Sequence, residues 1–313
     1  MLAGTITEFS VGQRSAGIAS GPDGNLWFTE HDVHRIGRIT PAGSVTEFSA
    51  GITGAPSPTG IAAGPDGNLW FTETTGERIG RITPAGVITE FSNGISTAAT
   101  PSSFGAGAGP TGIAAGPDGN MWFTEYNGNR IGRITPAGVV TEFSSGITAQ
   151  AALGGIARGP DGNLWFTEGF VNRIGRITPT GTVTEFSSGS TSAAGIAAGH
   201  DGNLWFTAST YIGRITPAGV VTQFSSGLTS GGFDPFTGKP NSPAPLGITA
   251  GPDGNVWFTE FGANRVARIT PAGVITEFSA GITGVAQPTA ITTGPDGNLW
   301  FTEPTFGRIG RLR

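Results

Sequence analysis

Tryptophan recurs along the chain at nearly constant intervals, and this spacing constrains the fold more than any other feature. Successive tryptophans are 43, 52, 43, 40, 52 and 43 residues apart. Each one lies in a copy of the same repeat, which residues 60–91 represent well. The chain therefore contains seven repeats, marked by Trp27, Trp70, Trp122, Trp165, Trp205, Trp257 and Trp300.

Each repeat contains four short apolar runs: Gly-Ile-Ala, Leu-Trp-Phe-Thr, Arg-Ile-Gly-Arg-Ile and Val/Ile-Thr-Glu-Phe. Their length and composition predict strands, and Pro-Asp-Gly-Asn and Thr-Pro-Ala-Gly between them are typical of tight turns. Four antiparallel strands repeated every 40 to 52 residues indicate a propeller blade. We therefore predict an all-β, seven-bladed propeller, with the first strand of each blade nearest the axis and the fourth outermost.

The two ends of the chain carry complementary parts of one repeat. Residues 5–9 match a fourth strand with no earlier strands before it, and the last repeat stops at 308–313, after its third strand. We expect the N-terminal strand to complete the last blade and so close the ring. The whole of 1–313 is then one domain. Because the sequence starts almost directly in a strand, we expect that any signal peptide is absent or has been removed.

Composition excludes several classes of partner. Only 12% of the residues are charged, the net charge is −5 and there is no basic cluster, so we expect no nucleic acid and no membrane as partners. The absence of cysteine excludes disulfides, thiolate metal sites and a cysteine nucleophile, and leaves the cellular location open.

The order of the strands separates the loops onto two faces. The Pro-Asp-Gly-Asn and Thr-Pro-Ala-Gly turns fall on one face, the bottom, and barely vary. The loops between second and third strands, and the connections between blades, fall on the other face, the top. Two connections are long, 93–110 and 227–245, and we expect them to face each other across the central opening. Their large apolar residues are Phe104, Phe233 and Phe236.

Glutamate ends the second strand and arginine begins the third strand in the same six repeats. In the fifth repeat both are lost, as Ala208 and Tyr211. This joint loss favours a structural ion pair, because removal of one partner alone would leave a charge uncompensated. The alternative is an open ring of carboxylates that binds cations or polar ligands. Since the fifth blade lacks these charges, a pocket could open there, with Tyr211 at its edge. The glutamates are Glu30, Glu73, Glu125, Glu168, Glu260 and Glu303.

Two of the three histidines are candidates for a metal site. His31 and His34 lie in the first top-face loop, in the sequence Glu-His-Asp-Val-His at 30–34. Imidazole is a common metal ligand, and two histidines beside two carboxylates could hold a divalent ion. His200 replaces a turn proline on the bottom face and is most simply a surface substitution.

The repeat Gly-Pro-Asp-Gly-Asn-Leu-Trp-Phe-Thr-Glu, followed by Asn-Arg-Ile-Gly-Arg-Ile-Thr-Pro-Ala-Gly and Ile-Thr-Glu-Phe, closely resembles the virginiamycin B lyase (streptogramin lyase) family over the whole chain. The resemblance implies a seven-bladed propeller and a magnesium-assisted elimination that linearises a cyclic depsipeptide antibiotic. It places a catalytic histidine in a Glu-Pro-His-Gly-Ile segment at the first strand of the last blade. Here Gln287 and Thr289 stand where that glutamate and histidine would be, while Glu303 lies near the family's second acidic position.

Two functions remain open. The favoured one is a non-catalytic propeller that binds a small-molecule or peptide ligand through its top face and central opening, because the expected catalytic residues are replaced. The alternative is a divalent-metal-dependent lyase acting on a cyclic depsipeptide (streptogramin B) or a related substrate, with Mg²⁺ or another divalent cation implied by the resemblance alone. We expect a monomer. Candidate binding residues are Glu30, His31, His34, Glu73, Glu125, Glu168, Tyr211, Glu260, Gln287, Thr289 and Glu303.

Overall fold

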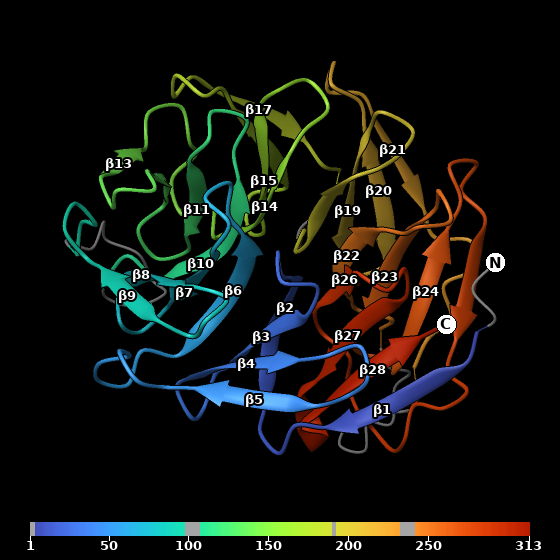
Figure 1. Cartoon of the computed structure of the whole chain (residues 1–313). Helices are drawn as coiled ribbons and strands as arrows, with labels where there is room; N and C mark the ends of the chain where they lie inside the picture. Colours follow the sequence, from blue (N-terminus) through green and yellow to red (C-terminus); the bar gives the residue numbers. More distant parts are fainter. Residues whose placement is uncertain (1–3, 98–106, 190–191, 232–241) are drawn as a thin grey trace, which may run out of the picture.

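The computed structural model describes residues 4–97, 107–189, 192–231 and 242–313. They form seven four-stranded antiparallel sheets arranged as the blades of a closed ring (Figure 1). Neighbouring first strands contact one another all the way around the axis, and the last contacts the first. The predicted seven-bladed propeller is confirmed. We number the blades from one to seven, blade one being that of Trp27.

The strand boundaries follow the repeat closely. The first strands are β2 (Ser15–Ser20), β6 (Pro58–Ala63), β10 (Pro110–Ala115), β14 (Leu153–Arg158), β18 (Ile196–Ala198), β22 (Pro245–Ala250) and β26 (Ile291–Thr293). The second strands are β3 (Leu26–Glu30), β7 (Leu69–Glu73), β11 (Met121–Glu125), β15 (Leu164–Glu168), β19 (Leu204–Ala208), β23 (Val256–Glu260) and β27 (Leu299–Glu303).

The outer half of each blade is equally regular. The third strands are β4 (Arg35–Ile39), β8 (Arg78–Ile82), β12 (Arg130–Ile134), β16 (Arg173–Ile177), β20 (Tyr211–Ile215), β24 (Arg265–Ile269) and β28 (Arg308–Leu312). The fourth strands are β5 (Val45–Phe48), β9 (Ile88–Phe91), β13 (Val140–Phe143), β17 (Val183–Ser187), β21 (Val221–Phe224), β25 (Ile275–Phe278) and β1 (Ile6–Ser10). A short 3₁₀ helix, η1 (Pro304–Phe306), lies in the last top-face loop.

The N-terminal strand closes the ring as predicted. β1 pairs antiparallel with β28, so that strands from the two ends of the chain share the last sheet (Figure 1). Phe9 of β1 stacks on Trp300 with ring centroids 5.4 Å apart, as the fourth-strand phenylalanine of each other blade stacks on its own tryptophan. The closing blade is therefore equivalent to the others in its packing.

Each tryptophan is core, and its polar group is satisfied on the bottom face. The seven tryptophans are at most 1% exposed. In blade two, Trp70 Nε1 donates to Asp66 Oδ1 of the Pro-Asp-Gly-Asn turn at 3.0 Å, and Asn68 Nδ2 donates to the other oxygen of Asp66. Arg81 lies over both Trp70 and Phe91 and donates to the carbonyl of Pro136 in the next blade. Packing and polar contacts together therefore link neighbouring blades at the bottom.

A ring of threonine hydroxyls joins neighbouring first strands nearer the top. In blade two, Thr72 Oγ1 accepts a hydrogen bond from Gly60 N and donates to the carbonyl of Thr111 in blade three. The equivalent donation occurs between every pair of neighbouring blades, at 2.7–3.1 Å. This ring of seven hydrogen bonds closes through Thr302 and the carbonyl of Ala16, and it fixes the spacing of the first strands around the axis.

Parts of both long connections lie outside the described residues, and Phe104, Phe233 and Phe236 are among them. Their predicted approach across the central opening therefore stays a prediction. Within the described ranges, no helix is long and apolar enough to cross a membrane.

Candidate functional site

A central cavity of about 1000 Å³ lies at the top end of the ring. Every blade contributes to its wall with the start of its first strand and with the loop that follows its second strand. In blade seven, for example, Thr289 and Ala290 line the cavity together with Pro304. This confirms that the variable loops gather on one face, around the axis, opposite the invariant turns.

One repeat position supplies a cavity-lining residue in all seven blades, and its identity differs each time. It is the residue directly after the second strand, where the preceding position is glutamate in six blades. Of the residues at this position, only His31 was predicted as a site residue, although the signal is visible in the sequence: maximal variation inside an otherwise constant repeat. The seven residues are His31, Thr74, Tyr126, Gly169, Ser209, Phe261 and Pro304.

Hydroxyl groups in the wall are largely engaged with the protein itself. Thr74 Oγ1 donates to the carbonyl of Pro110 and can accept from Thr59 Oγ1, whose alternative acceptor is the carbonyl of Ser57. Thr111 makes the corresponding bond to Thr124. Glycine and alanine occupy much of the remaining wall, so most of the cavity offers small apolar groups to a ligand.

Thr289 and Gln287 lie where the resemblance predicts the catalytic pair. Thr289 lines the central cavity, and its Oγ1 shares a hydrogen bond with Thr302 Oγ1 at 2.7 Å. Gln287 Oε1 accepts a hydrogen bond from Thr305 Oγ1 at 3.0 Å. Neither side chain carries a charge, and both are held by neighbouring threonines of the last blade.

A second cavity of about 620 Å³ adjoins the first at the seam between blades seven and one. Gln287 and Asp32 line this side cavity, while Arg14, Phe261 and Thr289 line both cavities. The two spaces therefore form one continuous candidate site, with Arg14 and Thr289 at their junction.

His31 and His34 have different surroundings. His31 lines the central cavity, and its Nδ1 donates to Asp32 Oδ1 at 2.7 Å. The hydrogen bond from His31 keeps the pKa of Asp32 below its ordinary value and so favours its charged form. His31 is thus an imidazole oriented by a carboxylate at the edge of the cavity.

His34 replaces an asparagine that has a structural role in other blades. It has a positive φ of 56°, and its Nδ1 accepts a hydrogen bond from Ser57 N at 3.3 Å. In blade six, Asn264 has a φ of 59° and its Oδ1 accepts from Gln287 N at 2.8 Å. His34 therefore fixes the start of the next blade, and it lines neither cavity. Metal binding by His31 and His34 stays a prediction.

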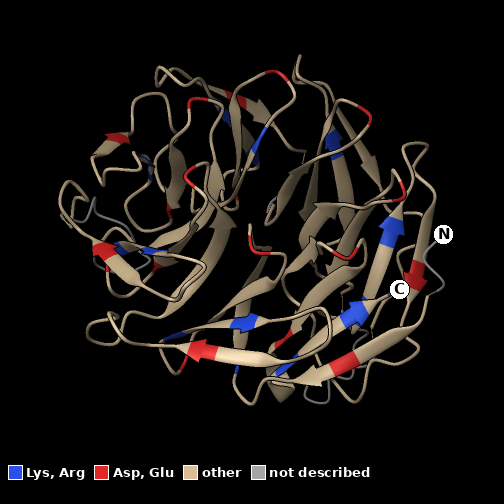
Figure 2. Ribbon diagram, in the orientation of Figure 1, with Lys and Arg blue, Asp and Glu red and all other residues tan. Residues whose placement is uncertain are grey.

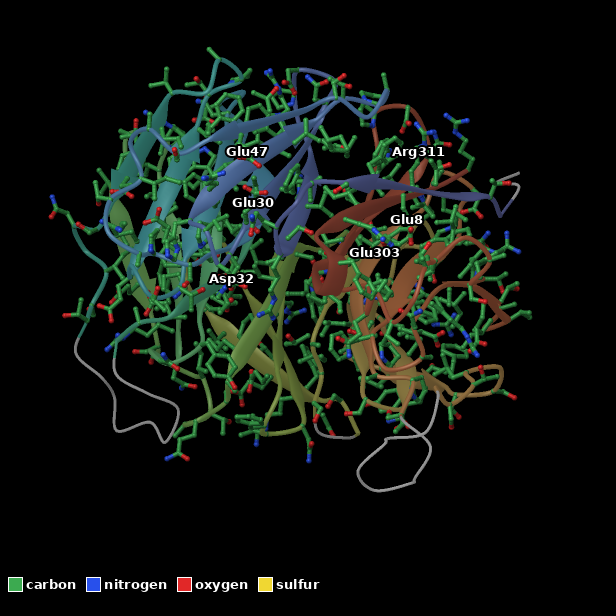
Figure 3. All side chains as sticks on the ribbon, turned by 90° about the horizontal axis from the view of Figure 1, so that it is seen from below. Glu8, Glu30, Asp32, Glu47, Glu303 and Arg311 are labelled. Atoms are coloured by element: carbon green, nitrogen blue, oxygen red, sulfur yellow. The ribbon has the colours of Figure 1, made fainter. Side chains whose placement is uncertain are left out.

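The six second-strand glutamates lie beneath the site rather than in it. All are fully buried, and none lines either cavity. Burial raises the pKa of Glu30 and Glu73 to about 7 and that of Glu125, Glu168, Glu260 and Glu303 to about 8. Repulsion from the fourth-strand glutamate of the same blade adds to this shift. In Figure 3 these neighbours are labelled in two blades, Glu30 with Glu47 and Glu303 with Glu8.

The predicted ion pair between these glutamates and the third-strand arginines holds in two blades and is wrong in the other four. Glu73 Oε2 lies 2.8 Å from Arg78 Nε, and Glu125 Oε2 lies 3.7 Å from Arg130 Nη1. Elsewhere the arginine pairs with the fourth-strand glutamate, and Figure 2 shows acidic positions in red and basic positions in blue on the adjacent strands β1 and β28, which carry one of these pairs. The four pairs are Arg35–Glu47, Arg173–Glu185, Arg265–Glu277 and Arg308–Glu8.

Arginine and the fourth-strand glutamate together hold the connection from the preceding blade. Thr53, between blades one and two, donates through N and Oγ1 to the two oxygens of Glu90, at 2.8 and 2.6 Å. Arg78 donates to the carbonyl of Thr53 at 2.5 Å. The same glutamate contact recurs at Ser96–Glu142, Thr148–Glu185 and Thr229–Glu277.

Blade five replaces three charged groups of this arrangement with neutral ones. Besides Ala208 and Tyr211, its fourth strand has Gln223 in place of glutamate. Tyr211 Oη and Gln223 Nε2 both donate to the carbonyl of Ser188, at 3.0 and 3.2 Å. Tyr211 is buried and lines neither cavity, so the structure places it in this contact and not at the edge of either cavity.

The donor groups of the site do not fit a magnesium ion held by protein side chains. Among the described residues that line the two cavities, Asp32 is the one carboxylate, and its Oδ1 is occupied by His31. Mg²⁺ in proteins favours oxygen ligands that include one or two available carboxylates. The described ranges also hold no group of three histidine, aspartate or glutamate side chains placed to bind a metal.

The fold and the cavity define a seven-bladed β-propeller whose candidate ligand site lies on the axis at its top face. The chain belongs to the virginiamycin B lyase family, whose model matches residues 1–108, 95–228 and 226–313. No curated protein matches the chain.

Solved structures of lyases resemble the chain over its full length. A streptogramin B lyase structure is 34% identical, with a TM-score of 0.84, and the alignment covers 99% of this chain and 97% of that one. The selenomethionine-substituted virginiamycin B lyase of Staphylococcus aureus is 35% identical, with a TM-score of 0.83 and 98% of each chain covered. A catalytically inactive histidine-to-alanine variant of the latter enzyme, crystallised with quinupristin, gives the same values.

Proposed function

We propose that this protein is a member of the virginiamycin B lyase family that binds a ligand in its central cavity without linearising streptogramin B antibiotics. The observation that carries the proposal is Thr289, which stands where the resemblance places the catalytic histidine and whose hydroxyl is engaged with Thr302. An inactive variant of the S. aureus relative likewise lacks a histidine.

Thr289 does not supply the chemistry of an elimination. The reaction needs a base that accepts a proton from carbon near neutral pH, and a threonine hydroxyl is not such a base. Gln287 replaces a carboxylate with a neutral amide, and Asp32 is the single carboxylate among the described cavity residues. Loss of a general base costs a rate factor of about 10² to 10⁴.

The test is mass spectrometry of a cyclic streptogramin B depsipeptide incubated with this protein and Mg²⁺, beside the S. aureus lyase. We expect ring opening at least about 10²-fold slower than that of the lyase. The double variant Gln287→Glu, Thr289→His should raise the rate, because it restores a base and a charged neighbour. Ring opening by the unchanged protein at the rate of the lyase would overturn the proposal.

One observation favours the alternative of a lyase with a relocated base. His31 lines the same cavity as Thr289, and Asp32 orients its imidazole as a carboxylate orients a catalytic histidine. If the unchanged protein opens the ring, the variant His31→Ala decides between the two positions. Loss of activity in this variant assigns the base to His31, whereas retained activity excludes it.

A further inference from the structure

The charged groups of the central cavity are distributed unevenly. Among the described residues that line it, none is acidic, and Arg14 is the one guanidinium. Arg14 precedes β2, and the equivalent positions in the other blades hold small or neutral residues: Ser57, Gly109, Ala152, Ser192, Ala244 and Gln287. The sevenfold repeat is therefore broken at this position by one positive charge at the edge of the site.

Arg14 has no ion-pair partner within the described chain. Its side chain is exposed and takes part in none of the salt bridges or side-chain hydrogen bonds between described residues. Attraction by Arg14 helps to lower the pKa of Asp32, but the Oδ1 of Asp32 accepts its hydrogen bond from His31 and not from Arg14. The guanidinium therefore keeps its donors available at the junction of the two cavities.

Aromatic side chains gather on the wall formed by blades three and four. Tyr126 and Phe170 meet edge to face, with ring centroids 6.3 Å apart at an angle of 72°. Both line the central cavity, and Phe170 is 50% exposed. Blade four lies three blades from blade one, so this wall and Arg14 lie on different sides of the axis (Figure 1).

Most other polar groups of the cavity are engaged. The threonine ring uses the first-strand carbonyls, and Thr59, Thr111 and Thr289 bond to other protein groups. A ligand therefore meets an apolar wall with an aromatic pair on one side and an unpaired guanidinium on the other.

We propose that the central cavity binds an anionic aromatic molecule, whose ring system contacts Tyr126 and Phe170 and whose acidic group receives hydrogen bonds from Arg14. This inference deepens the proposed function and rests on it, because it names the chemical class of the ligand. The planar guanidinium of arginine suits a carboxylate or sulfonate, and edge-to-face rings that line a cavity suit an aromatic body. A volume of about 1000 Å³ accommodates such a molecule with several rings.

Two fluorescent probes test the proposal directly. Anilinonaphthalenesulfonate is an aromatic anion, and phenylnaphthylamine is the same ring system without the sulfonate. We expect the folded protein to bind the anion with one-to-one stoichiometry, about three- to tenfold more tightly than the neutral probe at low salt. The variant Arg14→Gln should abolish this preference and leave the affinity for the neutral probe unchanged. Phe170→Ala should weaken both probes.

The matched control is Arg158→Gln. Arg158 ends β14 at the opposite end of a first strand and lines neither cavity, so its loss changes the net charge equally without touching the site. We expect this variant to keep the full preference, and thermal melting should show that all variants are folded. Equal binding of the two probes by the unchanged protein, no binding of either, or the same loss in Arg158→Gln would each overturn the proposal.

The depsipeptide assay separates this proposal from the proposed function. If the protein opens the antibiotic ring but prefers the anionic probe through Arg14, the non-catalytic assignment is wrong and the anion site stands. If it opens no ring and shows no preference that depends on Arg14, the anion site is wrong and the non-catalytic assignment stands.

Discussion

The carboxylates of the bottom face and those of the second strands differ in how the protein satisfies them. Each bottom-face aspartate accepts hydrogen bonds from a tryptophan and an asparagine of its own blade. Burial alone would raise the pKa of Asp66, but these bonds outweigh it and hold the pKa below the ordinary value of 3.8. In contrast, neither oxygen of Glu168 has a hydrogen-bond partner of normal geometry, and burial beside Glu185 raises its pKa from 4.5 to about 8.

This difference shows that the repeat stabilises its two ends by different means. The bottom face combines stacked rings with charged hydrogen bonds that are complete in every blade. The layer below the top face holds glutamates whose pKa is raised by burial to about 7 or about 8, and the arginines beside them serve the connections between blades. The repeat carries the bottom-face feature in every blade and the upper-layer charges in every blade except blade five, which has Ala208, Tyr211 and Gln223 instead.

The largest expected effect follows removal of one bottom-face carboxylate. Asp66→Ala leaves Trp70 Nε1 and Asn68 Nδ2 without their acceptor, and each is at least partly buried. We expect the free energy of unfolding to fall by about 2–3 kcal/mol, as when a buried donor loses a charged partner. Chemical denaturation at pH 7 measures it, with Asp66→Asn as the control because an amide oxygen can still accept from Trp70.

A change in stability below about 0.5 kcal/mol for Asp66→Ala would contradict the comparison. It would mean that other groups accept the hydrogen bonds of Trp70 and Asn68. The two ends of the blade would then not differ as their hydrogen bonds indicate.

The second expected effect is a pH dependence that Glu168 carries. A raised folded-state pKa means that the stabilising contribution of this carboxyl is full below its ordinary value of 4.5 and is lost as the pH rises through about 8. Glu168→Gln removes that loss, so its stability relative to the unchanged protein should be higher at pH 8 than at pH 5, by ~2–3 kcal/mol.

The measurement is urea denaturation of both proteins across this pH range. The cost of burying the amide is the same at each pH, so the pH-dependent part isolates the carboxyl. Asp66→Asn is the opposite control, since a lowered pKa contributes stability that is lost only as the pH falls through its acidic range. A difference between Glu168→Gln and the unchanged protein that is constant from pH 5 to pH 8 would contradict the raised pKa.

The fold could be predicted entirely from the repeat, because period, turn residues and complementary termini all specify one closed ring. The partners of the second-strand glutamates were predicted less accurately than the fold. Alternation along a strand puts Glu168 on the same side as Leu164 and Phe166, which face the neighbouring blade, so its burial was present in the sequence. The role of His34 was also indicated, by asparagine at the same position in other blades, such as Asn264. The fourth-strand partner of each arginine depends on side-chain packing, which the repeat does not specify.

The smallest expected effect distinguishes blades two and four within the upper layer. Glu73 and Arg78 are hydrogen-bonded at 2.8 Å, whereas the ion-pair partner of Arg173 is Glu185 and not Glu168. Double-mutant cycles with alanine at pH 8 should therefore give a coupling energy of about 1 kcal/mol for Glu73 and Arg78 and less than about 0.5 kcal/mol for Glu168 and Arg173. Each cycle uses chemical denaturation of four proteins.

Equal coupling in the two blades would show that the arginines interact equally with the second-strand glutamates, and the joint loss at Ala208 and Tyr211 would then reflect a direct ion pair. Unequal coupling would instead assign that loss to the fourth-strand partner, which blade five has also replaced, with Gln223.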